Sequence, residues 1–492
     1  MKIVIAYPPL SSAKGTPLLS QNRQFQWFHS PTYIYPVIPA SAATLLHQQG
    51  YQVAWLDGIA EKWTYSQWLT KLKHEQPNLL FIETKTPVIT QHWKIITQLK
   101  KQFPQLKIIL AGDHVTALPQ ESFKKSPVDF IITGGHYDFL LLSIVNHLTK
   151  KTKLASGIWY RKKLNTKYQI LNTGKFQSSQ NLNQLPFIDR QLTKYQLYAY
   201  KNGNFKYTPA TYIMAGRDCW WRKHGGCTFC AWTTLFPQFS QRSTTNVLNE
   251  IGQLINLGIK ELFDDTGTFP AGKWLQQFCQ GMIKRNYHKK ITLGCNLRFG
   301  SLTKKDYQLL AKANFRLLLY GLESANQTTL NRLNKGTKLN TIESELKIIK
   351  QVNQQYKSQL EPHVTCMIGY PWETLTQANN TIKFTQNLFK KNLIDSLQAT
   401  VIIPYPGTKL FQQAKRNHWL KTTNWNHYDM KQPILKTPLT KKQILHLTQN
   451  IYTSCLTPKF ILKKLLAIRS LADLKWFINA GYKVITHYLD FL

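Results

Sequence analysis

The chain has 492 residues, 43% of them hydrophobic and 12% aromatic, which is enough apolar material for two or three packed domains and excludes a disordered protein. It carries 63 Lys and Arg against 24 Asp and Glu, a formal charge of +39, which favours an anionic partner or substrate. Because the basic residues are spread along the whole chain, we do not expect that partner to be nucleic acid.

The sequence predicts neither secretion nor a membrane span. The first residues, MKIVIAYPP, lack the ordered charged, apolar and cleavage regions of a signal peptide. No window reaches the roughly 18 uninterrupted apolar residues of a spanning helix. The cysteine count of seven is odd, and three of the cysteines fall within twelve residues, which is unlike a disulfide framework. We therefore expect a protein of the reducing cytoplasm.

Residues 1–150 alternate short apolar runs with helical patterns, which predicts a doubly wound, Rossmann-like α/β domain with a parallel sheet. Between the runs lie helical stretches at 40–49 and 90–102, which end at a glycine and before a proline. Ligands of such sheets bind outside the carboxyl ends of the strands. The expected strands are 3–6, 53–56, 79–82, 108–111 and 130–132.

After a predicted connector at 151–206, residues 207–415 contain six further apolar runs with helices between them. This rhythm predicts a partial (β/α)6 barrel of the TIM type, in which the chemistry lies at the carboxyl ends of the strands. Residues 416–492 show helical periodicity, at 444–447 and 461–466, and are predicted to form a C-terminal helical cap. The expected barrel strands are 212–215, 262–263, 291–293, 317–320, 364–367 and 397–402.

The tail mixes aromatic residues with lysines, at 476–478 and 488–492. This composition is compatible with a packed terminal helix and with peripheral contact with a membrane.

Three cysteines follow the first barrel strand: Cys219, Cys227 and Cys230. The two residues between the last pair allow both sulfurs to face one metal centre. Three thiolates without a fourth leave one iron of a cubane cluster open to a substrate, whereas His224 would complete a structural zinc site. Their position at a barrel strand end favours catalysis. The other cysteines are scattered and are expected to be small buried hydrophobes: Cys279, Cys295, Cys366 and Cys455.

The cysteine loop resembles the signature of the radical S-adenosylmethionine superfamily, in which three cysteines bind a 4Fe-4S cluster and an aromatic residue, here Phe229, precedes the last one. The resemblance implies that Cys219, Cys227 and Cys230 are the cluster ligands. The family usually has three residues between its first two cysteines, whereas this chain has seven. We interpret the difference as a bulge that Gly225 and its neighbouring glycine allow to fold back.

Further motifs of the family follow the later strands and imply contacts with S-adenosylmethionine. The resemblance places acidic residues near this cofactor after the second strand, polar contacts with its carboxylate or ribose after the third, and a glutamate that accepts from its α-amino group after the fourth. The Lys-Gly-Thr sequence at 335–337, downstream of the fourth strand, fits the same pattern. The simpler interpretations are a helix cap after the second strand, a surface ion pair after the third, and ordinary turns elsewhere. The implied residues are Asp264, Asp265, Asn296, Arg298, Glu323, Ser324 and Gly369.

The N-terminal domain resembles the cobalamin-binding domain fused to many radical S-adenosylmethionine enzymes, on the residues Tyr7-Pro8-Pro9, 35–39, 112–119 and 128–130. The Asp-x-His-x-x-Gly loop that supplies a cobalt-ligating histidine in some cobalamin proteins is absent after the first strand. His114 lies elsewhere, and we expect it to be structural. The resemblance implies either cobalamin without a protein imidazole ligand or a vestigial domain.

As a whole, the resemblance implies an enzyme that reductively cleaves S-adenosylmethionine to a 5′-deoxyadenosyl radical, with electrons from a donor such as a flavodoxin or ferredoxin. Our leading hypothesis is cobalamin-dependent methylation of an unactivated carbon of a small-molecule or peptide substrate, which the charge suggests is anionic. One alternative is a radical rearrangement or ring closure with a vestigial cobalamin domain. An alternative of another class is a zinc-stabilised nucleic-acid-binding protein, motivated by the charge and the aromatic content.

Overall fold

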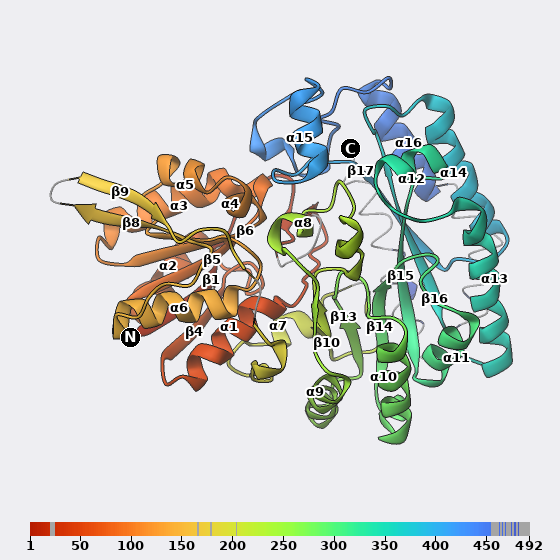
Figure 1. The fold of residues 1–492 in the computed structure, drawn as a ribbon, viewed down its shortest axis with the longest axis horizontal. Coiled ribbons are helices and arrows are strands. Elements are labelled where there is room, and N and C mark those ends of the chain that lie inside the picture. The colour runs from red at the N-terminus through yellow and green to blue at the C-terminus, as the bar shows by residue number, and fades with distance from the viewer. Residues whose placement is uncertain are drawn as a thin grey trace.

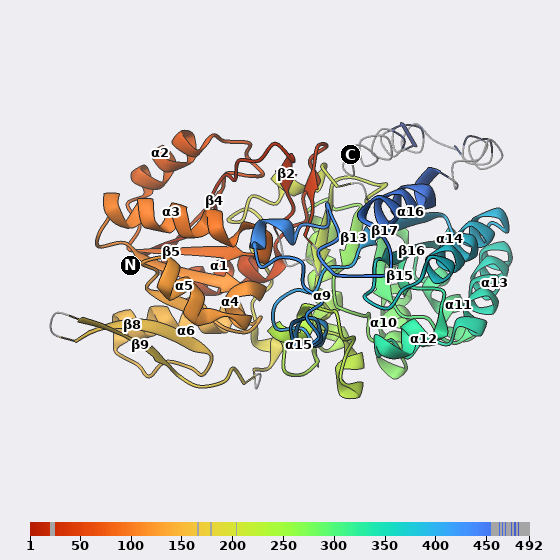
Figure 2. The ribbon, with the colours of Figure 1, turned by 90° about the horizontal axis from the view of Figure 1, so that it is seen from above.

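A computed structural model describes residues 1–19, 25–164, 167–177, 180–202 and 204–453, with scattered positions beyond them. Figures 1 and 2 show two α/β units side by side, the N-terminal one in red to yellow and the C-terminal one in green to blue. Each unit is built around its own sheet.

The N-terminal unit contains a seven-stranded sheet of order β4-β1-β5-β6-β7-β8-β9. Its first five strands in this order are parallel, and Ile3 of β1 is aligned with Val53 on one side and Leu79 on the other. All five predicted runs are strands, which confirms the expected parallel sheet. The parallel strands are β1 (Lys2–Tyr7), β4 (Gln52–Asp57), β5 (Leu79–Thr84), β6 (Lys107–Gly112) and β7 (Phe130–Ile132).

Helices cover both faces of this sheet, as expected for a doubly wound domain. Alternate strand residues point to opposite faces, so Ile3 and Ile5 pack in the core that contains α1 and α6. Val4 and Ala6 pack instead in a second core with α2, α3 and α5. The helices are α1 (Val37–Gln48), α2 (Tyr65–Glu75), α3 (Ile89–Gln102), α4 (Asp113–Ala117), α5 (Pro119–Lys125) and α6 (Tyr137–Lys150).

The segment expected as a connector adds two strands to the first sheet. β8 (Ile158–Leu164) runs antiparallel to β7, and β9 (Lys167–Asn172) runs antiparallel to β8. Their outer positions are basic and exposed, which explains why the apolar pattern of the sequence did not reveal them. The short helix α7 (Gln196–Ala199) then leads to the second unit.

The second unit contains a six-stranded parallel sheet of order β10-β13-β14-β15-β16-β17. This order follows the sequence, as in a barrel built by successive β/α units, and it confirms the predicted partial barrel. The strands are β10 (Ala210–Ile213), β13 (Glu261–Asp264), β14 (Thr292–Leu297), β15 (Phe315–Glu323), β16 (Glu361–Ile368) and β17 (Ser396–Val401).

Amphipathic helices follow these strands and pack on the outside of the sheet (Figure 1). Three of them begin with a side-chain cap, from Ser243, Thr303 and Thr374, which satisfies amide groups that the first turn leaves unpaired. The helices are α9 (Thr244–Asn256), α10 (Lys273–Lys284), α11 (Lys304–Lys312), α12 (Gln327–Arg332), α13 (Leu339–Tyr356) and α14 (Leu375–Lys390).

The C-terminal region begins with α15 (Lys409–Arg416) and continues to α16 (Lys441–Thr453), which packs through Ile444 and Ile451 on the last barrel strands. Between them, Trp425 returns to the N-terminal unit and donates to Glu121 at 3.0 Å. The tail stretches 461–466, 476–478 and 488–492 lie wholly or partly outside the described residues. No helix within the described part of the chain is long and apolar enough to cross a membrane.

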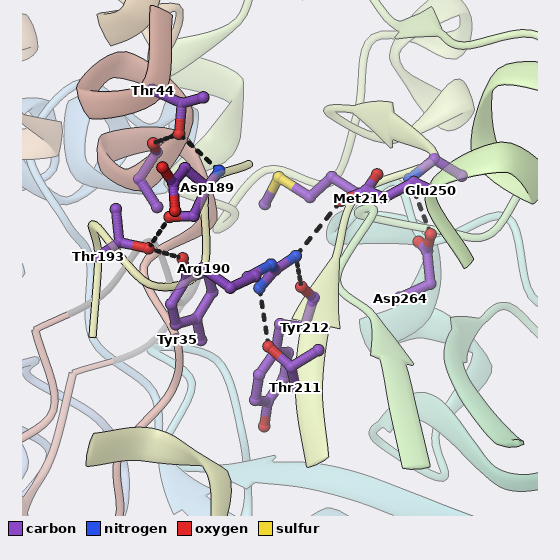
Figure 3. A network of polar contacts seen from close by, with 12 residues as sticks. Tyr35, Thr44, Asp189, Arg190, Thr193, Thr211, Tyr212, Met214, Glu250 and Asp264 are labelled. Atoms are coloured by element: carbon purple, nitrogen blue, oxygen red, sulfur yellow. Dashed lines mark hydrogen bonds and ion pairs between the residues drawn. The ribbon is translucent and has the colours of Figure 1, made fainter. Parts of the chain in front are cut away.

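A buried arginine of the connector joins the two units (Figure 3). Arg190 donates to Thr211 Oγ1 at 2.7 Å and to the carbonyl of Tyr212 at 3.0 Å, and it lies 3.3 Å from Glu250 Oε1. Its guanidinium also lies 4.4 Å from the ring of Tyr35 in the N-terminal unit. One side chain therefore binds strand β10, helix α9 and the N-terminal unit together.

A second buried pair crosses between the units directly beside the cysteine loop. Arg217 donates to both carboxylate oxygens of Asp138, at 3.1 and 2.6 Å, and Ser41 adds a third hydrogen bond. Burial by itself would raise the pKa of Asp138, but the Arg217 charge and its hydrogen bonds hold that pKa below its ordinary value. The ionised Asp138 carboxylate therefore stabilises the folded protein fully at pH values above its pKa in the unfolded chain. This stabilisation is lost as the pH falls through the lower pKa of the folded state.

We predict that Asp138→Asn destabilises the protein by about 3–5 kcal/mol, because Arg217 would keep its charge in a buried site without a counterion. The free energy of unfolding from urea titration at pH 7 measures this effect. Lys391→Met is the control, since Lys391 and Glu343 form an exposed pair whose loss should leave the unfolding midpoint unchanged. Equal midpoints for the two variants would contradict the prediction.

Candidate active site

The cysteine loop leaves the carboxyl end of the first barrel strand and is closed at its base. Gly216–Arg217 (β11) pairs antiparallel with Ser240–Gln241 (β12). The loop after the second strand supports it: Asp264 Oδ2 accepts from the amide of Ala215 at 2.7 Å, and Thr266 Oγ1 accepts from the amide of Gly216 at 2.9 Å. The backbone at the base of the loop is therefore held on one side by β12 and on the other by the side chains of Asp264 and Thr266.

Gly267 allows the closest approach between these two loops. Its amide donates to the carbonyl of Asp218 at 2.9 Å, and a Cβ at this position would lie 2.7 Å from that carbonyl oxygen and 2.9 Å from Cys219 Cβ. Any side chain here would push the first cysteine away from its place.

The three cysteines of the loop are each partly buried. Cys219 Sγ lies 3.0 Å from Thr268 Oγ1, and Cys227 Sγ lies 3.7 Å from Arg298 Nη1. Within the described residues, no three His, Cys, Asp or Glu side chains are grouped as one metal ion would require. A cubane holds its thiolates on separate irons and so farther apart than a single tetrahedral zinc does. The three partly buried thiols on one loop have the donor chemistry that such a cluster requires.

His224 is exposed, and its imidazole ring packs against the ring of a neighbouring tryptophan. The centroid of its imidazole is 4.3 Å from that of Trp221, and it belongs to the outer turn of the loop. In this position the imidazole packs on Trp221, and no metal-binding group that includes it is found within the described residues.

The additional residues between the first two cysteines form a single 3-10 turn, Trp220–His224. Trp221 anchors this turn: its Nε1 donates to the carbonyl of Asn334 at 2.7 Å, and its ring lies so close to Gly336 that a Cβ there would come within 2.2 Å. Gly225 and Gly226 then turn the chain back with φ of 86° and 68°, values that favour glycine. The extra residues thus form a bulge, as expected.

Asp264 and Asp265 occupy different environments. Asp264 is buried, and its two carboxylate oxygens accept from the amides of Ala215 and Thr266. Burial raises its pKa to about 6, although these hydrogen bonds act in the opposite direction. Asp265 accepts from Asn296 Nδ2 at 3.4 Å, so Asp265 and Asn296 come together after the second and third strands.

Arg298 is buried and forms no surface ion pair. Its guanidinium lies 4.2 Å from the ring of Trp221, donates to the backbone carbonyl of Lys335 and approaches the sulfur of Cys227. The third-strand arginine is therefore adjacent to the cysteine loop, and no acidic side chain pairs with it among the described residues.

Glu323 ends the fourth strand and is paired with Lys335 at 2.7 Å, with both side chains buried. The backbone of Glu323 has φ of 67°, a conformation that costs energy for a side-chain-bearing residue. Gly321 leaves the space for the pair, because a Cβ there would lie 2.2 Å from Glu323 Oε1. Lys335 belongs to the Lys-Gly-Thr sequence downstream of the fourth strand, which the sequence analysis noted as a motif without naming Lys335 among the candidate site residues.

Ser324 directly follows Glu323 at the end of β15, and Gly369 follows β16. The hydroxyl of Ser324 is fully buried and accepts from the amide of Asn326 at 3.3 Å. The amide of Gly369 donates to Glu373 Oε2 at 2.7 Å, and burial raises the pKa of Glu373 to about 7. The structure therefore gives Ser324 and Gly369 protein partners of their own.

The carboxyl edge of the N-terminal sheet carries buried acids. Tyr7 donates to Glu83, and Tyr198 donates to Asp57 at 2.5 Å. Burial raises the pKa of Glu83 to about 7 and that of Asp57 to about 6. This edge abuts the second unit, since the amide of Gly135 donates to the carbonyl of Leu235 at 2.9 Å.

Buried hydroxyls without a hydrogen-bond partner within the described residues include those of Thr86, which follows β5, of Thr228 in the cysteine loop and of Thr234 in the short helix α8 (Trp232–Leu235). Buried polar atoms are normally satisfied, so each of these hydroxyls is available to a polar ligand. His114 lies edge-on to Trp93 and Trp425, with Nε2 3.3 Å from Glu121, and both of its buried ring nitrogens lack a hydrogen-bond partner within the described residues.

Comparisons with known proteins agree with this architecture. No family model matches the chain. An uncharacterised methyltransferase of Pyrococcus horikoshii is 25% identical over 469 residues, 94% of both chains. An anaerobic magnesium-protoporphyrin IX monomethyl ester cyclase of Rubrivivax gelatinosus is 21% identical over 411 residues, 82% of this chain and 70% of the relative.

Two solved structures share the fold across both units. The radical S-adenosylmethionine methyltransferase TsrM from Kitasatospora setae, with tryptophan and an S-adenosylmethionine analogue bound, has a TM-score of 0.68 at 13% identity and covers 93% of this chain and 90% of its own. The cobalamin-dependent S-adenosylmethionine radical enzyme OxsB, with aqua-cobalamin and S-adenosylmethionine bound, has a TM-score of 0.68 at 14% identity and covers 99% of this chain and 72% of its own.

Proposed function

We propose that this chain, which has the fold of cobalamin-dependent radical S-adenosylmethionine enzymes, cleaves S-adenosylmethionine reductively and methylates an unactivated carbon. The observation that carries the proposal is the three-cysteine loop at the mouth of the partial barrel, joined to Arg298 and to the buried Lys335 and Glu323 pair. The relative from Pyrococcus horikoshii, which matches over nearly the full length and is named a methyltransferase, supports it.

In this proposal Cys219, Cys227 and Cys230 hold a 4Fe-4S cluster, which when bound supplies the electron that breaks a carbon–sulfur bond of S-adenosylmethionine. Glu323 accepts from the α-amino group of that cofactor, and Arg298 binds its carboxylate, since a guanidinium and a carboxylate make paired hydrogen bonds.

The other residues of the set have polar or supporting roles in this proposal. Asp265 and Asn296, which face each other at 3.4 Å, are placed to bind the ribose hydroxyls. Asp264 holds the cysteine loop in position through its backbone bonds, and Ser324 and Gly369 support the strand ends.

Cobalamin, when bound, supplies the methyl group that is transferred. We assign its place to the carboxyl edge of the N-terminal sheet, where Thr86 follows β5 and Thr234 of α8 comes close to Ala117, and both of these threonines have an unsatisfied hydroxyl. His114 is enclosed by Trp93 and Trp425, so this assignment uses no imidazole ligand from that residue. Enclosure between the two units would keep water away from a substrate radical.

A ring-forming reaction is the second candidate, favoured by the similarity to the magnesium-protoporphyrin ester cyclase. Both reactions require cleavage of S-adenosylmethionine, and cobalamin-dependent methyl transfer separates them. The net charge of +39 favours an anionic small molecule as the substrate in either case.

We expect the protein reconstituted anaerobically with iron and sulfide to release 5′-deoxyadenosine from S-adenosylmethionine when dithionite is added. Cys219→Ala, Cys227→Ala and Cys230→Ala should each lose the iron–sulfur absorption and the cleavage, because a ligand of the cluster is removed. Cys279→Ala, which changes a buried thiol of α10, is the control and should keep both. Retention of zinc with no iron uptake by the wild-type chain would rule the proposal out.

Glu323→Gln should weaken binding of S-adenosylmethionine by about tenfold to a hundredfold, the loss expected for a charge-assisted hydrogen bond of about 1.5–3 kcal/mol. Equilibrium binding to the reconstituted protein by isothermal titration calorimetry measures it. Glu343→Gln, at a half-buried surface glutamate of α13, should bind like wild type. An unchanged dissociation constant for Glu323→Gln would remove Glu323 from the binding site.

We predict that the reconstituted chain retains hydroxocobalamin through gel filtration at about one per chain, as the cobalamin absorption bands would show. Thr86→Val and Thr234→Val together should reduce this retention, because they replace hydroxyls that have no protein partner. Their matched control is Thr70→Val, at an exposed position of α2. A chain that cleaves S-adenosylmethionine but retains no cobalamin would favour ring closure over methylation.

A further inference from the structure

We infer that the outer face of the cysteine loop is a docking surface for a small acidic electron-transfer protein. The inference rests on the proposed function, since reductive cleavage needs an electron from outside the chain. We call this surface the basic rim and define it by six exposed cations from three segments. They are Lys223, Arg332, Lys338, Lys409, Lys415 and Arg416.

Hydrogen bonds bring the three segments of the basic rim together. Asn334 Nδ2 donates to the carbonyls of His224 and Gly226 at 2.7 and 2.8 Å, which fixes the loop after α12 against the cysteine loop. Lys409 Nζ lies 3.5 Å from the carbonyl oxygen of Gly225, and the amide of Leu410 donates to the carbonyl of Thr228 at 2.9 Å. Segments far apart in the sequence thus border one exposed turn.

The charge of the basic rim is not balanced by nearby acids of the same segments. The sequence contains no Asp or Glu at 219–249, 324–342 or 396–428. Asp218, just before the first cysteine, is buried and bound to Arg222 at 2.6 Å. Glu323, just before the second segment, is buried and bound to Lys335. The basic rim therefore carries a positive electrostatic potential, which steers a negatively charged protein toward the cysteine loop.

The basic rim includes the outer turn of the cysteine loop itself, through Lys223. Gly225 is exposed and lies two residues before Cys227, which is itself partly exposed. A redox protein seated on the rim would therefore face the proposed cluster across a single turn of backbone. In each transfer the donor is oxidised by one electron and the cluster is reduced by one.

The test compares a protein donor with a small-molecule reductant on the full, reconstituted chain. The first variant reverses three rim charges, Lys338→Glu, Lys409→Glu and Arg416→Glu. The matched control reverses three exposed charges of the β8–β9 hairpin, Lys162→Glu, Lys163→Glu and Lys167→Glu. Release of 5′-deoxyadenosine is measured at low salt against the concentration of reduced flavodoxin, and separately with dithionite.

We expect the rim variant to lose at least about tenfold in kcat/KM for flavodoxin, and the loss to shrink as salt screens the field. The hairpin variant should stay within about twofold of wild type, and dithionite should drive all three proteins equally.

Equal losses in the two variants would show a general effect of net charge and overturn the docking surface. Unchanged flavodoxin kinetics in the rim variant, together with loss of a transfer-RNA gel shift, would assign the rim to nucleic acid instead. Failure of dithionite to cleave S-adenosylmethionine with the wild-type protein would reject the proposed function itself.

Discussion

The buried ion pair between Arg217 and Asp138 sets the relation between the two halves of the molecule. Arg217 stands two residues before the first cysteine, and Asp138 lies at the start of α6 in the N-terminal unit. Both charged side chains are buried, so each requires the other as its counterion. Arg190 adds a second anchor between the connector and the barrel. The cysteine loop is thereby held against the unit that resembles a cobalamin-binding domain.

The cysteine loop is positioned mainly by the strand ends around it. The carboxylate of Asp264 bonds to the backbone that leads into the loop, and Gly267 lets the second-strand loop touch Cys219. Trp221 occupies the space between Arg298 and the loop after α12. The enlarged spacing between the first cysteines is therefore part of the packing, because its extra turn orients a buried arginine beside Cys227.

The distribution of charge follows from the scarcity of acids. Many acidic side chains are used inside the protein, where a buried arginine or lysine requires a counterion. Each buried pair also removes a cation, so the net charge of the surface is not raised. The ratio of basic to acidic side chains at the surface is nevertheless higher than in the whole composition, and the face around the cysteine loop is a clear case. Buried pairs of this kind join Arg217 to Asp138, Arg190 and Arg242 to Glu250, Arg316 to Glu261, and Lys335 to Glu323.

The sequence by itself determined the two α/β units and the candidate cluster ligands. Continuous apolar runs specify buried parallel strands, and the spacing of Cys219, Cys227 and Cys230 is a local property of the chain. The β8–β9 hairpin escaped prediction because its apolar residues, at 158–160 and 170–171, form only short runs beside exposed polar and basic positions.

Tertiary structure alone decided which side chains meet. The pairing of Lys335 with Glu323, the support from Asp264 and the contact of Arg298 with the cysteine loop all join residues from different strands. Sequence periodicity shows which face of a strand is buried, but it does not show which loops the closing of the barrel brings together.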